Sequence, residues 1–112
     1  MISKANKKRI SELMKVIILL NNPNEAAKFF RDLLTEKELV EFGNRWKAAV
    51  MLANNIKYTE IEKETGLSST TVARVSNWLN KGTGGYKMIL KKVNSHQHKF
   101  FSLQRKGCVD IS

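Results

Sequence analysis

The residues whose types and spacing could support a specific chemistry lie between Tyr58 and Leu79. The second half of this stretch predicts a helix whose outer face carries small polar side chains and one arginine. These residues are Ser69, Thr70, Ala73, Arg74 and Asn77, with Ser68 and Thr71 at the start of the helix. Short side chains allow a helix to lie deep in the major groove of DNA, where its first residues reach base edges and phosphates. These seven residues are therefore the candidate DNA contacts.

A first short helix and a tight turn are expected to position this face. Thr59 and Glu62 have the spacing of a capping box and predict a helix over residues 60–65. Gly66 follows this helix directly. A glycine there permits the left-handed conformation that a tight turn between helices requires.

A second short helix follows, capped by Ser68 or Ser69 and ending near Leu79. Apolar residues occupy the positions where two helices that cross steeply touch each other, namely Ile61, Leu67, Val72 and Val75. Two short helices joined in this way form a helix-turn-helix unit.

The N-terminal part predicts two further helices. The first covers residues 7–20. Its apolar residues recur at helical spacing, at Ile10, Leu13, Met14, Ile17 and Leu20. Asn22 caps the second helix, with Pro23 in its first turn and Glu25 at the capping-box distance.

Thr35 and Glu38 form another capping box, which opens a third helix. Its apolar residues form one stripe at Leu39, Phe42, Gly43, Trp46, Ala49, Val50 and Ala53, while Val40, Met51 and Leu52 lie outside that stripe. A helix that is apolar on several faces must be covered on several faces, and a chain this short provides little cover. We therefore expect a core shared between the two chains of a homodimer. Trp46 and Met51 are expected in that core, with the lining of a ligand pocket as the alternative.

A glycine-rich turn follows at residues 80–85. It lacks the preceding strand and the following Gly-Lys-Ser/Thr of a phosphate-binding loop, so it predicts a helix end and a turn. Residues 86–93 predict a last short helix. The basic tail, residues 94–112, has no period and is expected to be either disordered or an arm on DNA.

The chain is therefore divided into four regions. These are a helical dimerisation region (1–57), the helix-turn-helix (58–79), the glycine turn with a short helix (80–93) and the basic tail (94–112).

Composition restricts the partner and the compartment. The net charge is +10 and the isoelectric point is near 10.0, which favours a polyanion, with nucleic acid ahead of an anionic membrane surface. Cys108 is the only cysteine, which suits a reducing compartment. The apolar run at residues 16–20 is too short to span a membrane. We expect a cytoplasmic protein that binds double-stranded DNA and no membrane.

Several of these residues also resemble a known family. The Leu-Leu-Thr helix start at residues 33–35, the Gly-x-Arg at residues 43–45 and the Arg-x-Ser-Asn at residues 74–77 resemble the Trp repressor family. The glycine turn at residues 82–86 is similar to its YerC/YecD-like branch. The resemblance covers residues 30–90 and implies an all-α, intertwined dimer that presents two helix-turn-helix heads to operator DNA. The implied function is transcription regulation of the repressor type.

The resemblance implies a ligand site as well. Two arginines that bracket the corepressor tryptophan in that family match Arg45 and Arg74, and a helix-start threonine matches Thr35. An arginine suits a carboxylate because its fork donates two parallel hydrogen bonds. However, Val75 and Trp78 stand where the family has the small glycine and serine that make room for the indole ring. We therefore expect no cofactor and weakened or absent L-tryptophan binding, with another small corepressor as the alternative.

Other chemistries find little support in the sequence. His96 and His98 lack a third ligand at defined spacing, so no metal site is expected. With both histidines in the tail, no catalytic Ser/His/Asp arrangement can be built, and we expect no enzyme. The alternative function is an RNA- or ribosome-associated basic protein that binds through its tail.

Overall fold

The computed structural model describes residues 1–95, which form six helices and no strand. The helices are α1 (Lys4–Ile17), α2 (Pro23–Leu33), α3 (Glu36–Ala53), α4 (Tyr58–Thr65), α5 (Ser69–Lys81) and α6 (Gly85–Ser95). The all-α class expected from the sequence is confirmed. His96, His98, Cys108 and most of the predicted tail lie outside the described residues. None of the described helices has the length and apolar character needed to cross a membrane.

Of the described residues, 1–35 form one compact unit and 36–95 form another. In the first unit, α1 begins and ends three residues earlier than the predicted range 7–20. The Ser3 hydroxyl caps the helix by accepting the Asn6 N–H at 3.1 Å. At the other end, the Leu20 N–H bonds to the Ile17 carbonyl at 3.1 Å. This hydrogen bond joins residues three positions apart, as in a tight turn, rather than four apart as in an α-helix.

The cap of α2 is confirmed. The Asn22 side-chain oxygen accepts the Glu25 N–H at 2.9 Å, and Pro23 lies in the first turn. The Glu25 carboxylate accepts the N–H of Asn21 at 3.0 Å rather than that of the capping residue itself. Although α1 and α2 carry many apolar residues, none of their residues is buried within the chain.

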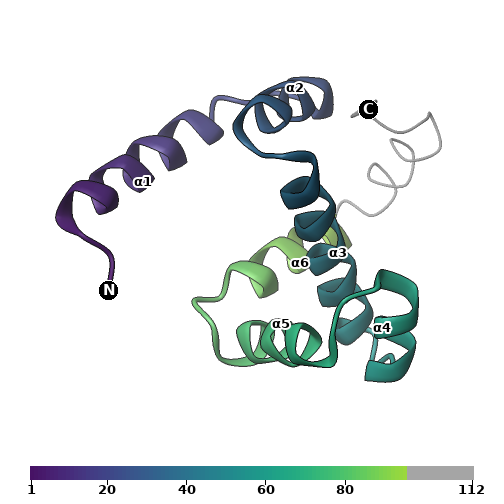
Figure 1. Ribbon diagram of the computed structural model, residues 1–112. Coiled ribbons are helices and arrows are strands. Elements are labelled where there is room, and N and C mark those ends of the chain that lie inside the picture. Colours follow the sequence, from purple (N-terminus) through teal and green to yellow (C-terminus); the bar gives the residue numbers. More distant parts are fainter. Residues whose placement is uncertain (96–112) are drawn as a thin grey trace. The chain divides into compact units, whose positions relative to one another are not determined.

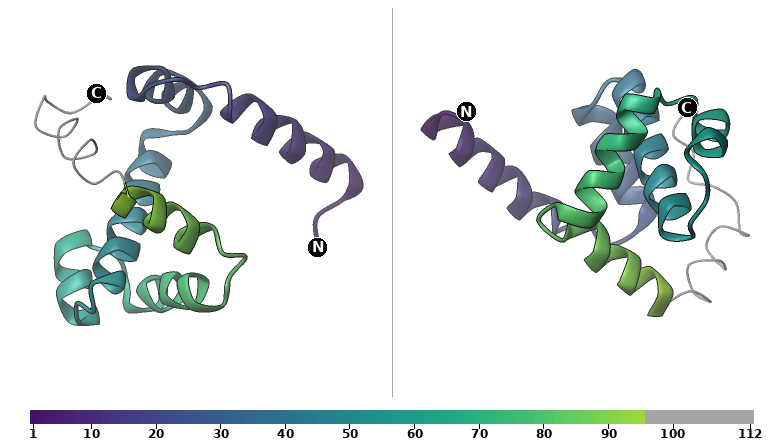
Figure 2. Two further views of the ribbon diagram at one scale, coloured as in Figure 1. Left: turned by 180° about the vertical axis from the view of Figure 1, so that it is seen from behind. Right: turned by 90° about the horizontal axis from the view of Figure 1, so that it is seen from below.

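The second unit is built around α3. Figure 1 shows α4 and α5 near the C-terminal end of this helix, and both pack against it and against each other. Helix α6 runs back from the end of α5 toward α3 (Figures 1 and 2). The buried core consists of Ala48, Ala49, Ile61, Val72 and Val75. The apolar contacts predicted for the two short helices are thus confirmed, and Leu67 and Met51 pack against this core.

The capping box predicted for α4 at Thr59 and Glu62 is wrong, because the helix begins one residue before Thr59. The N–H groups of Glu60 and Ile61 both bond to the Lys57 carbonyl at 3.1 Å, so helical hydrogen bonding starts at Lys57. Lys57 occupies the N-cap position and makes no side-chain capping bond.

The last two helices are longer than predicted. Helix α5 continues past Leu79 to Lys81, and α6 begins at Gly85 and ends at Ser95. Residues 94 and 95, which were assigned to the tail, are therefore helical.

Candidate nucleic-acid interface

Three residues, 66–68, connect α4 to α5. Gly66 has a φ of +74°, the left-handed conformation expected from the sequence, and its N–H bonds to the Glu62 carbonyl at 2.8 Å. A Cβ atom added at Gly66 would meet no neighbour within 4 Å. Glycine is therefore favoured here by the backbone conformation alone.

Thr65 joins the end of α4 to this turn. Its side chain is buried, and its hydroxyl donates to the Ile61 carbonyl at 2.7 Å while accepting the Leu67 N–H at 3.2 Å. Sequence reasoning missed this role. A threonine in the last turn of a helix could have indicated it, because serine and threonine hydroxyls commonly bond to the carbonyl four residues earlier in a helix.

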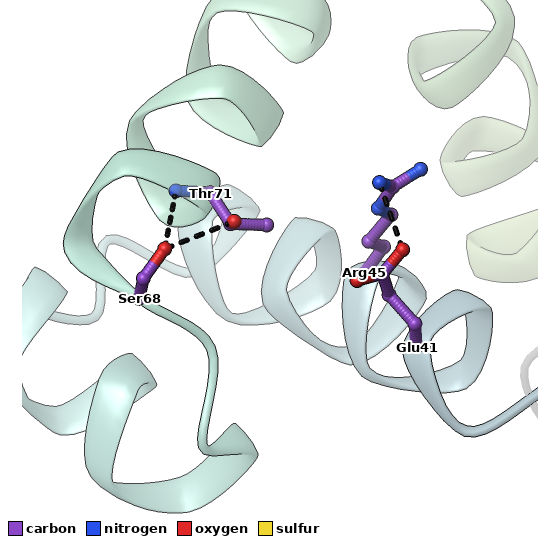
Figure 3. Close-up of polar contacts among 4 residues, drawn as sticks. All are labelled: Glu41, Arg45, Ser68 and Thr71. Carbon is purple, nitrogen blue, oxygen red and sulfur yellow. Dashed lines mark hydrogen bonds and ion pairs between the residues drawn. The ribbon is translucent and has the colours of Figure 1, made fainter. Parts of the chain in front are cut away.

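Ser68 caps α5. Its hydroxyl accepts the Thr71 N–H at 3.1 Å and lies 3.0 Å from the Thr71 hydroxyl, to which it donates (Figure 3). Of the two serines considered from the sequence, Ser68 is thus the cap, and Ser69 occupies the first helical position with its side chain exposed.

The outer face of α5 is exposed as expected, at Ser69, Thr70, Ala73, Arg74 and Asn77. Their spacing places these five residues on one side of the helix. On the opposite side Val72, Val75 and Leu79 are buried. Thr71 lies between the two sides, half-buried and engaged in the cap. The role of these residues as DNA contacts remains a prediction.

Charge is distributed unevenly along the second unit. Residues 65–95 contain no aspartate or glutamate and carry five basic residues, Arg74, Lys81, Lys87, Lys91 and Lys92. The six glutamates of residues 36–95 all precede residue 65, with three in the first half of α3 (positions 36, 38 and 41) and three in α4 (positions 60, 62 and 64). The Arg74 side chain is exposed and makes no hydrogen bond or ion pair with any residue of the described part. Helices α5 and α6 therefore present only positive charge to a partner.

Arg45 is held by groups of its own chain. Its Nη2 lies 3.0 Å from Oε2 of Glu41 (Figure 3). Its guanidinium carbon lies 5.8 Å from the centroid of the Phe42 ring and 5.6 Å from that of Trp78. Both distances are within the range of cation–π attraction. The buried Nε has no hydrogen-bond partner among the described residues. Arg45 thus links α3 to α5.

The three residues that the family resemblance assigns to a ligand are divided between the two units. Thr35 ends the first unit, whereas Arg45 and Arg74 belong to the second. Val75 is fully buried in the core, and Trp78 lies against the Arg45 guanidinium. Ligand binding by these residues remains a prediction.

A pocket of about 550 Å³ lies in the second unit, a feature that sequence reasoning did not locate. Its lining comes from α3, α5 and the residues that follow, namely Trp46, Trp78, Gly82, Thr83, Gly85, Tyr86, Met88 and Ile89. Trp46 and Met51 were both expected in the core, with a pocket lining as the alternative. Trp46 lines this pocket, whereas Met51 packs against the core. Burial raises the pKa of Tyr86 above its ordinary value of 10.0, and the nearby charge of Arg45 opposes this rise.

These features define the class of the protein, an all-α chain with a tightly linked helix pair at the end of a long helix. The sequence pattern of the Trp repressor protein family matches residues 8–94, and the chain belongs to this family.

Similar proteins agree with this assignment. The uncharacterized protein YerC of Bacillus subtilis (strain 168) is 37% identical over 92 residues, which cover 82% of this chain and 88% of YerC. The crystal structure of a TrpR-like protein from Eubacterium eligens has a TM-score of 0.74 at 31% identity and covers 78% of this chain and 90% of its own. A structure from Staphylococcus aureus has a TM-score of 0.73 at 36% identity, with coverage of 78% and 87%.

Proposed function

We propose that this protein is a sequence-specific DNA-binding regulator of transcription, of the repressor type, in which α4 and α5 form a helix-turn-helix unit. The observation that carries the proposal is the outer face of α5, where small polar side chains are exposed on a helix whose inner face is buried. The absence of acidic residues from 65 to 95 supports it, because α5 and α6 then offer only attractive charge to the phosphates. Membership of the Trp repressor family, whose members regulate transcription, supports it too. A DNA partner would place the protein in the cytoplasm.

Individual residues are proposed to have different roles. Ser69 and Thr70 lie at the exposed N-terminal end of α5, the part of a recognition helix that meets base edges. Arg74 lies one to two turns further along and is proposed to contact a phosphate. Phosphate contacts fix position without reading sequence, whereas base contacts determine the preferred sequence.

The functional unit is proposed to be a homodimer. None of the residues of α1 or α2 is buried within one chain. Large apolar side chains are exposed in the connection between these two helices, at Ile18 (80% exposed) and Leu19 (69%), and on α3, at Val40 (58%) and Phe42 (47%). Exposed apolar surface of this extent is typical of an association site. The family resemblance, which implies an intertwined dimer, supports the same assembly.

Light scattering tests the dimer. We expect twice the chain mass of 12.8 kDa at micromolar concentration. Val40→Glu introduces a charge at a position that only a second chain would bury, so it should yield monomers. Lys47→Glu, at an exposed polar position of the same helix, should leave the dimer intact. A folded monomer in the unaltered protein would refute the assembly.

The proposed regulator does not depend on L-tryptophan. Arg45 is already engaged by Glu41 and by the rings of Phe42 and Trp78. Val75 occupies the core, so the space that the family's glycine leaves open is filled. We propose that α5 is held in its DNA-binding position by the chain's own side chains.

Selection of bound sites from random duplex DNA tests the function. A two-fold symmetric dimer should select a near-palindrome with half-sites roughly 34 Å apart, and its affinity should fall steeply with salt because counterions are released. Ser69→Ala and Thr70→Ala should change the selected sequence, and Arg74→Ala should weaken all sequences alike. Ser11→Ala, at an exposed position of α1, is the control. An unchanged preference in both α5 variants would refute the assignment of the reading helix, and tighter binding to RNA than to duplex DNA would favour the RNA-associated alternative.

A further inference from the structure

Helix α5 is packed into the core of its unit along one face. Val72 and Val75 are fully buried, and Leu79 is 9% exposed. At 3.6 residues per turn, these three side chains leave the helix axis within about 60° of one another. Packing along a single face opposes displacement of the helix toward or away from that face, but it opposes rotation about the helix axis less strongly. A contact in a second direction is needed to fix the rotation.

Trp78 supplies a contact in another direction. It lies about 90° around the helix from the centre of the buried face, and it is 40% exposed. The centroid of its ring lies 5.6 Å from the guanidinium carbon of Arg45, which belongs to α3. This distance is within the range of cation–π attraction. Arg45 and Trp78 therefore connect α3 to a different side of α5 from the one that the core holds.

Arg45 is itself held in place on α3. Its Nη2 lies 3.0 Å from Oε2 of Glu41, one turn earlier, and its guanidinium carbon lies 5.8 Å from the centroid of the Phe42 ring. The Nε is buried and has no hydrogen-bond partner among the described residues, which lowers the free energy of unfolding. An apolar side chain would avoid this cost, so stability alone does not account for an arginine at this position.

Small rotations of α5 have large effects at its exposed polar face. The side-chain ends of Ser69 and Thr70 lie roughly 5–6 Å from the helix axis, so a rotation of about 15° displaces them by about 1.5 Å. The groups of a binding site must be held within about 0.5 Å of the productive geometry. A rotation of this size is therefore enough to disrupt hydrogen bonds to base edges.

We propose that Arg45 is a positioning residue for DNA recognition, which fixes the rotation of α5 through the ring of Trp78 without touching DNA itself. This role rests on the function proposed above and adds a determinant of specificity outside the exposed face of α5. Glu41, Phe42, Arg45 and Trp78 all lie in one unit of one chain. The contact therefore needs no surface that a second chain leaves open.

Affinities for the selected duplex and for random duplex, measured at one salt concentration, test this role. Positioning changes the ratio of the two affinities, whereas loss of a charge weakens both alike. Arg45→Met and Trp78→Leu should each lower the ratio roughly fivefold or more, and the double variant should lose no more than either single one, because the two residues act through one contact. Trp78→Phe keeps an aromatic face and should retain most of the ratio. Lys47→Met removes one positive charge at an exposed position of the same helix and should leave the ratio unchanged.

Circular dichroism and urea unfolding verify that each variant is folded at the assay temperature. A role limited to stability would lower the urea midpoint of Arg45→Met and leave its affinity ratio unchanged. That outcome, or losses that multiply in the double variant, would overturn the positioning role. If Trp78→Leu does not fold, the comparison of Arg45→Met with Lys47→Met decides. An unaltered protein that selects no DNA sequence would refute the proposed function itself, whereas normal selection with an unchanged ratio in Arg45→Met would refute the positioning role alone.

Discussion

Replacing Gly66 with alanine isolates the contribution of one backbone conformation. The residue has a φ of +74°, and a methyl group there meets no atom within 4 Å, so no steric clash is introduced. Holding an L-residue in the left-handed conformation costs roughly 1–2 kcal/mol. Alanine also restricts the unfolded chain, which offsets about 0.4–1 kcal/mol. The net expectation is a loss of about 1 kcal/mol, or roughly fivefold in the folding equilibrium.

Two glycines of the next turn serve as matched comparisons. Gly84 also has positive φ (+96°) and open space, so Gly84→Ala should lose a similar free energy, whereas Gly85→Ala should lose none and gain up to about 1 kcal/mol. Urea unfolding measures all three variants, at one protein concentration because the stability of the proposed dimer would depend on concentration. The slope against urea should stay constant. A Gly66→Ala protein as stable as its parent, or a Gly85→Ala protein as destabilised as Gly66→Ala, would refute the reasoning.

Four further results are expected. Ser68→Ala removes the hydrogen bond to the Thr71 N–H and should cost about 1 kcal/mol of unfolding free energy; an unchanged urea midpoint would show that the cap is dispensable. Ile61→Ala empties a fully buried site and should cost about 2–5 kcal/mol in the same assay, and a smaller loss would mean a looser core. Because burial raises the pKa of Tyr86, the folded state binds the phenol proton more tightly than the unfolded state does. The free energy of unfolding should therefore keep this contribution below pH 10.0 and lose it as the pH rises further. Tyr86→Phe should remove this part of the decline, and an equal decline in both proteins would contradict it. Calorimetric titration with L-tryptophan should show weak or no binding and no effect on DNA affinity, whereas micromolar binding that tightens the DNA complex would restore a corepressor mechanism.

Local hydrogen bonding is the part of the fold that the sequence predicts best. The caps at Asn22 and Ser68 and the left-handed Gly66 depend on residues three or four positions away, so their patterns are visible in the chain. The prediction at Thr59 failed for an equally local reason. The backbone carbonyl of Lys57 accepts the first hydrogen bonds of α4. The side-chain pattern of the sequence does not indicate which carbonyl begins the helix.

The surroundings of Arg45 show where sequence reasoning ends. Its ion pair with Glu41 follows from helical spacing. Its contact with Trp78 does not, because it depends on how α3 and α5 cross. The same holds for the pocket, which exists only because α6 returns toward α3 and brings Met88 and Ile89 opposite Trp46. The residues of the exposed α5 face could be identified from the sequence, whereas the walls of the pocket could be identified only from the tertiary structure.

The hydrogen bonds around the turn have a consequence for the order of folding. Thr65 bonds to Ile61 and Leu67, and Ser68 bonds to Thr71, so every one of these bonds closes within eleven residues. Loops this short close on a time scale of roughly 10–100 ns, and proteins rich in such local contacts fold fast. The shape of the turn is thus encoded by its own neighbourhood. The surface that α5 exposes can therefore form early, and in the proposed dimer it would form before the two chains meet.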